Sequence, residues 1–234
     1  MKGLINKITL GDCLQVMKQI PDNSVDLIVT DPPYLYKITG GCGKSSLKNL
    51  QKFKTGLNHI KDGFDVDFVF SEFKRITKKF NLFCFCSNAQ ISEIMKWGED
   101  NNYSTTLLVW NKYNAVPFAN GTWRQDAEFI VHIREKGATF QGDSFLKRKV
   151  RKHSTVVSKW GHPTEKPISI ISDYIEIGSN ENDLVLDPFS GSGTTALACH
   201  ELKRNFIAIE KDQEYHRLSC ERLKQVQAQG VFNF

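Results

Sequence analysis

The tetrapeptide Asp31-Pro32-Pro33-Tyr34 is the first segment whose residue types and spacing could do chemistry. It directly follows the apolar run from Val25 to Thr30. Two consecutive prolines fix φ and cannot continue a strand, so we expect a carboxylate and an aromatic ring held rigidly at a strand's carboxyl end. A structural turn could need the prolines, but it would not need the acid and the aromatic ring. The pattern therefore indicates a catalytic role.

A second candidate site is the glycine-rich segment from Asp187 to Thr195, which follows an apolar run and opens a predicted helix. Its glycines let backbone approach a nucleotide-like ligand, and helix-start N–H groups can bind a carboxylate. Gly191 and Gly193 lack the third glycine of the dinucleotide fingerprint, so the signal for a nicotinamide cofactor is weak. Glu210 follows Gly193 by about 17 residues, where an acid commonly binds ribose hydroxyls.

The elements that must position these segments follow an α/β pattern with a mainly parallel sheet, because short apolar runs alternate with helix-length segments. Seven strands are predicted, at Lys7–Leu10, Val25–Thr30, Asn81–Cys86, Thr105–Trp110, Glu128–Ile133, Leu184–Asp187 and Asn205–Ile209. Apolar residues at three and four spacing predict helices at Leu14–Ile20, Val66–Lys79, Ala89–Asp100, Ile168–Ile177, Gly193–Leu202 and Gln213–Gln229.

Composition places the chain among ordinary globular proteins. It has 234 residues, 40% of them apolar and 24% charged, which predicts one large domain and argues against disorder or a disulfide scaffold. Its longest apolar stretches are far shorter than the ~20 residues that span a bilayer, so we expect a soluble, cytoplasmic protein. The six cysteines form no Cys-x-x-Cys pair, which favours buried free thiols over disulfides or a metal site.

Positive charge is concentrated in two segments. The net charge is only +5, yet Pro32 to Lys61 holds six lysines and no acid, and Ser144 to Gly161 is also free of acids. One such run is usually a solvated face. Two runs in a chain of low net charge focus the positive potential and favour contact with a phosphate backbone.

With these motifs the chain resembles the S-adenosylmethionine-dependent DNA amino-methyltransferases of the N6-adenine/N4-cytosine family. The tetrapeptide precedes the glycine-rich segment by about 155 residues, the permuted order of that family's beta group. Gly11-Asp12-Cys13 is similar to the acidic turn for the cofactor adenine. His162-Pro163-Thr164-Glu165-Lys166-Pro167 is similar to the segment that closes over the cofactor. The resemblance spans Lys7 to about Arg222.

The resemblance implies a Rossmann-like α/β methyltransferase fold with a circularly permuted motif order. The expected sheet is mainly parallel and seven-stranded, with an antiparallel hairpin. Residues 1–234 are expected to form one domain, with a mobile basic loop at about 35–64 and a small target-recognition insertion at about 134–161.

The implied reaction is methyl transfer from S-adenosylmethionine to the exocyclic N6 of adenine in double-stranded DNA, without a metal. Asp31 and the carbonyl of Pro32 would accept the amine protons and so favour a pyramidal nitrogen whose lone pair points at the methyl group. Tyr34 would stack on the flipped base and offset part of the cost of flipping. The expected catalytic residues are Asp31, Pro32, Pro33 and Tyr34.

Cofactor and DNA contacts are also implied. Asp12 and Glu210 would bind the adenine amine and the ribose hydroxyls of the cofactor. Asp187 and Lys166 would bracket its amino-acid end. For Lys166, a solvent-exposed side chain without a ligand role is a nearly even alternative. The expected cofactor contacts are Asp12, Cys13, Asp31, Lys166, Asp187, Phe189, Gly191, Ser192, Gly193, Thr194, Thr195 and Glu210. The expected DNA contacts are Lys44, Lys48, Trp123, Arg124, Lys147, Arg148, Lys149, Arg151 and Lys152, while Trp97 and Trp110 are expected in the core.

Two other functions stay open at this stage. The nearest is N4-cytosine methylation on the same scaffold, and Asp31 favours adenine because members acting on cytosine more often carry serine there. The other is a catalytically silent nucleic-acid-binding module. The sequence does not reveal the recognition sequence, and it leaves open a homodimer and a cognate restriction endonuclease. No membrane partner is expected.

Overall fold

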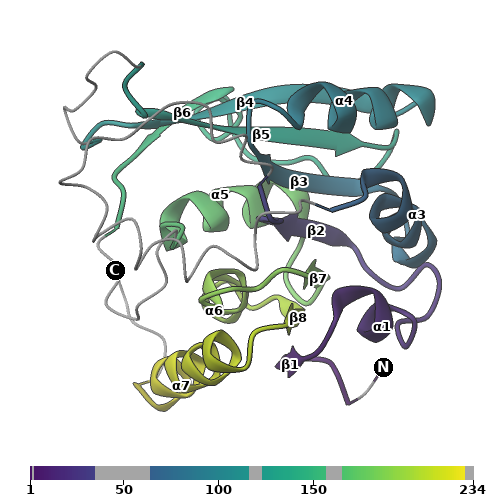
Figure 1. Cartoon of the computed structure of the whole chain (residues 1–234), viewed down its shortest axis with the longest axis vertical. Coiled ribbons are helices and arrows are strands. Elements are labelled where there is room, and N and C mark those ends of the chain that lie inside the picture. Colours follow the sequence, from purple (N-terminus) through teal and green to yellow (C-terminus); the bar gives the residue numbers. More distant parts are fainter. Residues whose placement is uncertain (2, 35–63, 116–122, 157–164, 230–234) are drawn as a thin grey trace, which may run out of the picture.

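The fold is a three-layer sandwich in which helices cover both faces of one mixed sheet (Figure 1). The computed structural model describes residues 1, 3–34, 64–115, 123–156 and 165–229. The sheet has eight strands in the order β1-β8-β7-β2-β3-β5-β4-β6. The strands are β1 (Lys7–Leu10), β2 (Leu27–Thr30), β3 (Asn81–Cys86), β4 (Ser104–Lys112), β5 (Ala127–Arg134), β6 (Val150–His153), β7 (Leu184–Asp187) and β8 (Asn205–Glu210).

Strand direction confirms the expected α/β class. β5 pairs antiparallel with both β3 and β4, and every other pairing in the sheet is parallel. All seven predicted strands are present, and β4 and β5 form the antiparallel hairpin. The expected count of seven is wrong by one, because β6 adds an eighth strand at the edge.

The sequence did not predict β6, because this strand lacks the apolar residues that mark a strand. Its four residues are Val150, Arg151, Lys152 and His153, and only Arg151 is buried. Backbone pairing with β4 holds it in the sheet, and the Trp110 indole N–H donates to the His153 carbonyl at 2.9 Å. Such pairing needs no side-chain pattern.

Within the described residues, six helices cover the two faces of the sheet. Their bounds are α1 (Cys13–Met17), α3 (Val66–Ile76), α4 (Ile91–Asp100), α5 (Ile168–Gly178), α6 (Thr194–Glu201) and α7 (Gln213–Gln229). Side chains of α1, α3 and α4 share one core cluster with Leu82, Cys84 and Cys86, whereas those of α5, α6 and α7 share the other with Phe83 and Phe85. This alternation is the two-residue period of a strand that is buried on both faces.

Several sequence predictions about the core are confirmed. Cys84, Cys86 and Cys199 are buried free thiols. Trp97 and Trp110 are buried. α3 ends three residues earlier than predicted, because Thr77 leaves the helix to form a parallel bridge with Val25 and its hydroxyl donates to the Phe73 carbonyl. No described helix has the length and apolar character needed to cross a bilayer.

The order of strands gathers the predicted site residues along one edge. β1, β8, β7 and β2 are consecutive neighbours and all run in one direction. Asp12 and Asp31 therefore lie just past two carboxyl ends, and Asp187 and Glu210 occupy the other two. In open α/β sheets, ligands bind outside this edge of the sheet.

Candidate active site

The turn after β2 is anchored from the start of α4. The Gln90 side-chain amide donates to the Pro33 carbonyl at 3.1 Å. Its own carbonyl oxygen accepts from the backbone N–H and the hydroxyl of Ser87, at 3.1 and 2.8 Å. Gln90 is buried, so these bonds hold the Asp31-Pro32-Pro33-Tyr34 turn without competition from water. Sequence analysis missed Gln90, because a lone glutamine before a helix carries no signal.

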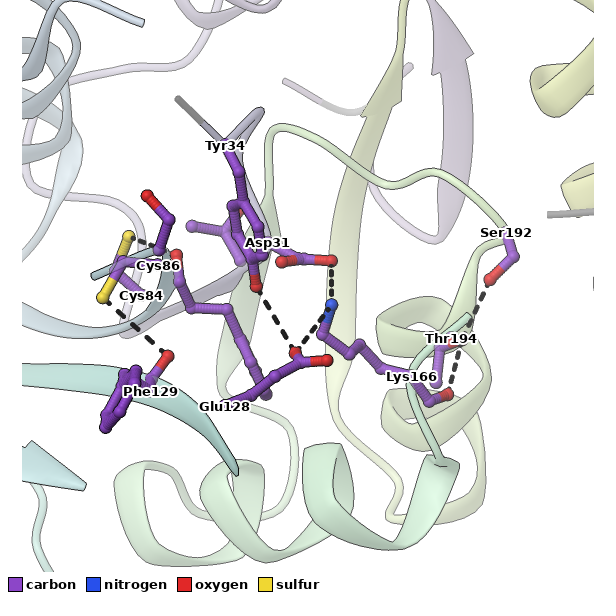
Figure 2. A network of polar contacts seen from close by, with 12 residues as sticks. Asp31, Tyr34, Cys84, Cys86, Glu128, Phe129, Lys166, Ser192 and Thr194 are labelled. Carbon is purple, nitrogen blue, oxygen red and sulfur yellow. Dashed lines mark hydrogen bonds and ion pairs between the residues drawn. The ribbon is translucent and has the colours of Figure 1, made fainter. Parts of the chain in front are cut away.

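Three charged side chains meet at this turn, those of Asp31, Glu128 and Lys166 (Figure 2). The Lys166 ammonium lies 2.5 Å from Asp31 Oδ2 and 3.3 Å from Glu128 Oε2. Lys112, at the end of β4, forms an ion pair with the other oxygen of Glu128. The Tyr34 hydroxyl donates to Glu128 at 3.5 Å. Charges of alternating sign thus run from Asp31 through Lys166 and Glu128 to Lys112.

Mutual attraction sets the ionisation of this cluster. Burial would lower the pKa of Lys166, but Asp31 and Glu128 outweigh burial and raise it, so the ammonium stays charged. Burial would raise the pKa of Glu128, but Lys166 and Lys112 lower it below its usual value. Burial raises the pKa of Asp31, and Lys166 limits that rise. The site therefore holds charged groups away from water.

Asp31 has one oxygen ready for a ligand. Its Oδ2 binds Lys166, whereas its Oδ1 is buried and has no hydrogen-bond partner. A buried acceptor without a partner is costly, so this oxygen needs an explanation, and a role in binding or catalysis is one. Because the carboxylate is negatively charged, the ligand group that fits Oδ1 is an N–H or O–H donor.

The glycine-rich segment forms a tight turn between β7 and α6. Gly191 and Gly193 have φ of 51° and 81°, in the left-handed region that glycine adopts without strain. A Cβ on Gly193 would lie 3.0 Å from the Ser219 Cβ on α7. The Ser190 hydroxyl in this turn is buried and has no hydrogen-bond partner. This hydroxyl is a further ligand candidate that sequence analysis did not single out.

Three acids surround the turn. Glu210 accepts the Gly191 N–H at 2.7 Å. Asp187 accepts the Thr30 hydroxyl at 2.9 Å and the Phe189 N–H at 3.2 Å, and burial raises the pKa of Asp187 to about 6. Asp12 caps α1 by accepting the N–H of the second and third residues of that helix, and it directly precedes Cys13. Hydroxyl, amine and ammonium donors suit this acceptor set.

The side chain of Lys166 reaches the turn after β2. Its ammonium binds Asp31, and its backbone carbonyl contacts the glycine-rich segment by accepting the Thr194 hydroxyl at 3.4 Å. The side chain is only 6% exposed, so the alternative of a solvated lysine at the helix entry is wrong. Ser192 and Thr194 hydroxyls lie 3.1 Å apart in the same network (Figure 2).

The expected DNA-contact residues separate into three groups. Arg151 is contradicted as a DNA contact, because its side chain is 7% exposed and is ion-paired with Asp173 on α5. Trp123 is 92% exposed, and Arg124 is exposed beside it. Four basic residues of the second basic run are also exposed: Lys147, Arg148, Lys149 and Lys152. Lys44 and Lys48 lie outside the described residues, as does most of the expected mobile loop.

Comparison with known proteins identifies the family. A family model for DNA methylases, of the N6/N4 class, matches residues 25–221. The chain belongs to this DNA methylase family. Type II methyltransferase M.HinfI of Haemophilus influenzae is 30% identical, over 97% of this chain and 70% of that protein. Type II methyltransferase M2.MboI of Moraxella bovis is 28% identical, over 92% of this chain and 86% of that protein.

Solved structures of other proteins have a similar fold to this DNA methyltransferase. The M1.HpyAVI–SAM complex has a TM-score of 0.67 and 27% identity, and the match covers 93% of this chain and 98% of that one. The PvuII cytosine-N4-specific methyltransferase has a TM-score of 0.70 at 16% identity, which is a likeness of fold alone. The part of this DNA methyltransferase that the family model matches includes Asp31, Glu128, Lys166 and Glu210. It begins after Asp12.

Proposed function

We propose that this DNA methyltransferase transfers a methyl group from S-adenosylmethionine to N6 of adenine in double-stranded DNA, with the adenine flipped out of the duplex. The observation that carries the proposal is the buried, unpartnered Oδ1 of Asp31. It lies in a turn that also presents Tyr34, at the carboxyl end of β2, next to the strand that leads into the glycine-rich turn.

The acceptor and donor set fits S-adenosylmethionine. Asp12 and Glu210 follow neighbouring strands and would accept the adenine amine and the ribose hydroxyls. Asp187 would accept the ammonium group, while the start of α6 and the Ser190 hydroxyl would bind the carboxylate. Cys13, Phe189, Gly191, Ser192, Gly193, Thr194 and Thr195 would line the same cradle. When bound, the cofactor supplies an electrophilic methyl group on a positively charged sulfur.

Asp31 would prepare the amine for attack. Its Oδ1 would accept one N6–H and the Pro32 carbonyl the other, which withdraws the lone pair from the ring and directs it toward the methyl group. As the nitrogen–carbon bond forms, the sulfur–carbon bond breaks and the nitrogen becomes positive, so one amine proton must leave along the bond to Asp31 Oδ1. Preorganised acceptors lower the energy of this charged state.

Tyr34 and the exposed basic residues would bring the base into place. The Tyr34 ring offers a stacking face worth ~1–3 kcal/mol, which offsets part of the cost of unstacking. Trp123 and Arg124 precede β5 on the chain by a few residues, and because both are exposed they could contact a duplex. Lys147, Arg148, Lys149 and Lys152 would contact phosphates. We keep Lys44 and Lys48 as further proposed contacts.

The test is to methylate unmodified duplex DNA and identify the product. The protein is incubated with S-adenosylmethionine and DNA, the DNA is digested to nucleosides, and the modified base is identified by mass spectrometry. We expect N6-methyldeoxyadenosine. N4-methyldeoxycytidine would overturn the assignment of the base. Cofactor binding without any methylated nucleoside would instead indicate a catalytically silent module.

A further inference from the structure

Lys166 is enclosed by the groups that the proposed reaction uses. Besides the two carboxylates, its ammonium lies 5.4 Å from the centre of the Tyr34 ring and 5.2 Å from that of Phe85. Both distances are within the range of a cation–π interaction. The ammonium is thus held by Asp31 and Glu128 and flanked by two rings.

The backbone of Lys166 is also fixed. The preceding residue, Glu165, forms a 2.7 Å ion pair with Arg222 of α7, and the side chains of both partners are less than a tenth exposed. Arg222 also donates to the Ser192 carbonyl at 3.1 Å. The following residue, Pro167, is the N-cap of α5. Lys166 is therefore clamped between the glycine-rich turn and the catalytic turn, which leaves its side chain little freedom.

We infer that Lys166 is a positioning residue for Asp31: it holds Oδ2 so that Oδ1 faces the target amine, and Glu128 holds Lys166 in place. This inference rests on the proposed function. It differs from the role in cofactor binding expected from the sequence, because the ammonium contacts the catalytic acid.

Charge gives Lys166 a second effect on Asp31. A protonated Asp31 would be a poorer acceptor for an amine proton, and burial favours that protonated form by raising the pKa of the carboxyl group. The Lys166 ammonium opposes burial, whereas Glu128 adds to it. The titratable groups that act on Asp31 or respond to its charge are Lys166 before α5, Glu128 on β5, Tyr34 in the same turn, Cys84 and Cys86 on β3, and Asp187 on β7.

The experiment compares the pH profiles of kcat for the wild type, Lys166→Met and Glu128→Gln. The acid limb is the part of the profile in which kcat falls toward low pH. Removing the ammonium in Lys166→Met should move this limb to higher pH by about 1–3 units. Activity should then partly recover at alkaline pH. Removing the negative charge of Glu128 should move the acid limb the opposite way and lower kcat because Lys166 loses one anchor. Lys166→Arg, which keeps the charge, should retain the wild-type acid limb.

Controls separate this role from folding and from cofactor binding. Lys96→Met removes an exposed lysine on α4 and should leave the profile unchanged. The dissociation constant for S-adenosylmethionine, from calorimetry, should change less than threefold in Lys166→Met. An unchanged acid limb with weakened cofactor binding would overturn the inference and return Lys166 to the cofactor. A wild-type protein that methylates no DNA would instead refute the proposed function itself.

Discussion

At the scale of single residues, two oxygens of one carboxylate have different surroundings. Oδ2 of Asp31 is bound to Lys166, and Oδ1 is buried without a partner. A catalytic group must be held within a narrow range of geometries to be effective, and the bonds of Gln90 and Lys166 supply that restraint. The orientation of the Asp31 carboxylate is therefore fixed by its neighbours.

Asp31→Ala should abolish methylation and spare cofactor binding. The alanine removes the acceptor for the amine proton, which should lower the rate about 100-fold or more. Transfer of tritiated methyl groups to DNA gives the rate, and calorimetry gives the affinity for S-adenosylmethionine. Turnover equal to the wild type would refute the role of Asp31. Asp31→Asn, which keeps an oxygen but not the charge, shows how much of the effect is electrostatic.

In the proposed cofactor site, Asp187 would bind the ammonium group at a cost in stability. Burial raises its pKa from 3.8 to about 6. The protonated form of Asp187 therefore favours folding. As the pH rises through 6, Asp187 ionises and the free energy of unfolding falls, by about 3 kcal/mol at pH 7. Asp187→Asn should thus be more stable than the wild type at pH 7 and equally stable at pH 4, as measured by urea unfolding.

The same variant should bind S-adenosylmethionine about tenfold more weakly or worse, because an amide pairs poorly with the ammonium group. Wild-type affinity should also rise with pH through 6 as Asp187 ionises. A cofactor affinity that is unchanged in Asp187→Asn would remove Asp187 from the proposed cradle while leaving the stability prediction intact.

At the scale of elements, β6 joins the predicted target-recognition insertion to α5. Arg151 of β6 forms an ion pair with Asp173 of α5. His153 bonds the same carboxylate at 3.0 Å and the Ser169 hydroxyl at 2.9 Å. α5 begins directly after Lys166 and Pro167. These contacts of polar side chains hold β6 against α5, the helix that follows Lys166.

Asp173→Ala should destabilise the fold through β6. It leaves Arg151 buried without its ion-pair partner, which costs about 3–5 kcal/mol in comparable pairs. The matched control is Asp100→Ala, which removes the partner of Lys96 in an exposed pair on α4 and should change stability by less than about 1 kcal/mol. Urea unfolding of the two variants measures the difference. Equal midpoints would show that the β6–α5 contact contributes little.

At the scale of the whole molecule, the parallel strands put the acids at one edge of the sheet and leave other charges elsewhere. Asp12, Asp31, Asp187 and Glu210 follow or end four neighbouring strands at their carboxyl ends. Lys7 begins β1 and Lys203 precedes β8, so both lie at the opposite edge. Lysines at the opposite edge can therefore serve as controls when electrostatic binding to DNA is tested.

Replacing Lys147, Arg148 and Lys149 with alanine should weaken DNA binding and flatten its salt dependence. Each lost phosphate contact changes the log–log slope by about 0.9, so the triple variant should lose up to about 2.7. Fluorescence anisotropy over a range of salt concentrations measures the slope. The control variant replaces Lys7, Lys203 and Lys18, an exposed lysine at the carboxyl end of α1. It changes the net charge equally and should leave the slope near the wild-type value. An unchanged slope in the first variant would place the duplex elsewhere.

The sequence by itself determined the α/β class, seven of the eight strands and the positions of the acids at strand ends. Short-range features suffice for these conclusions: an apolar run marks a buried strand, and prolines or glycines mark where it stops. The residues Asp31, Asp187 and Glu210 could be singled out for the same reason, since each directly follows or ends an apolar run.

Only the tertiary structure decided which other side chains complete the site. Glu128 is the second residue of β5, and it lies at the same edge of the sheet as Asp31 because β5 runs antiparallel to its neighbours. Lys112 ends β4 beside it, and Lys166 turns toward Asp31, 135 residues away in the chain. Strand direction and the pairing of distant charges depend on long-range contacts. For that reason the local sequence pattern could single out Asp31 but not the groups that hold it.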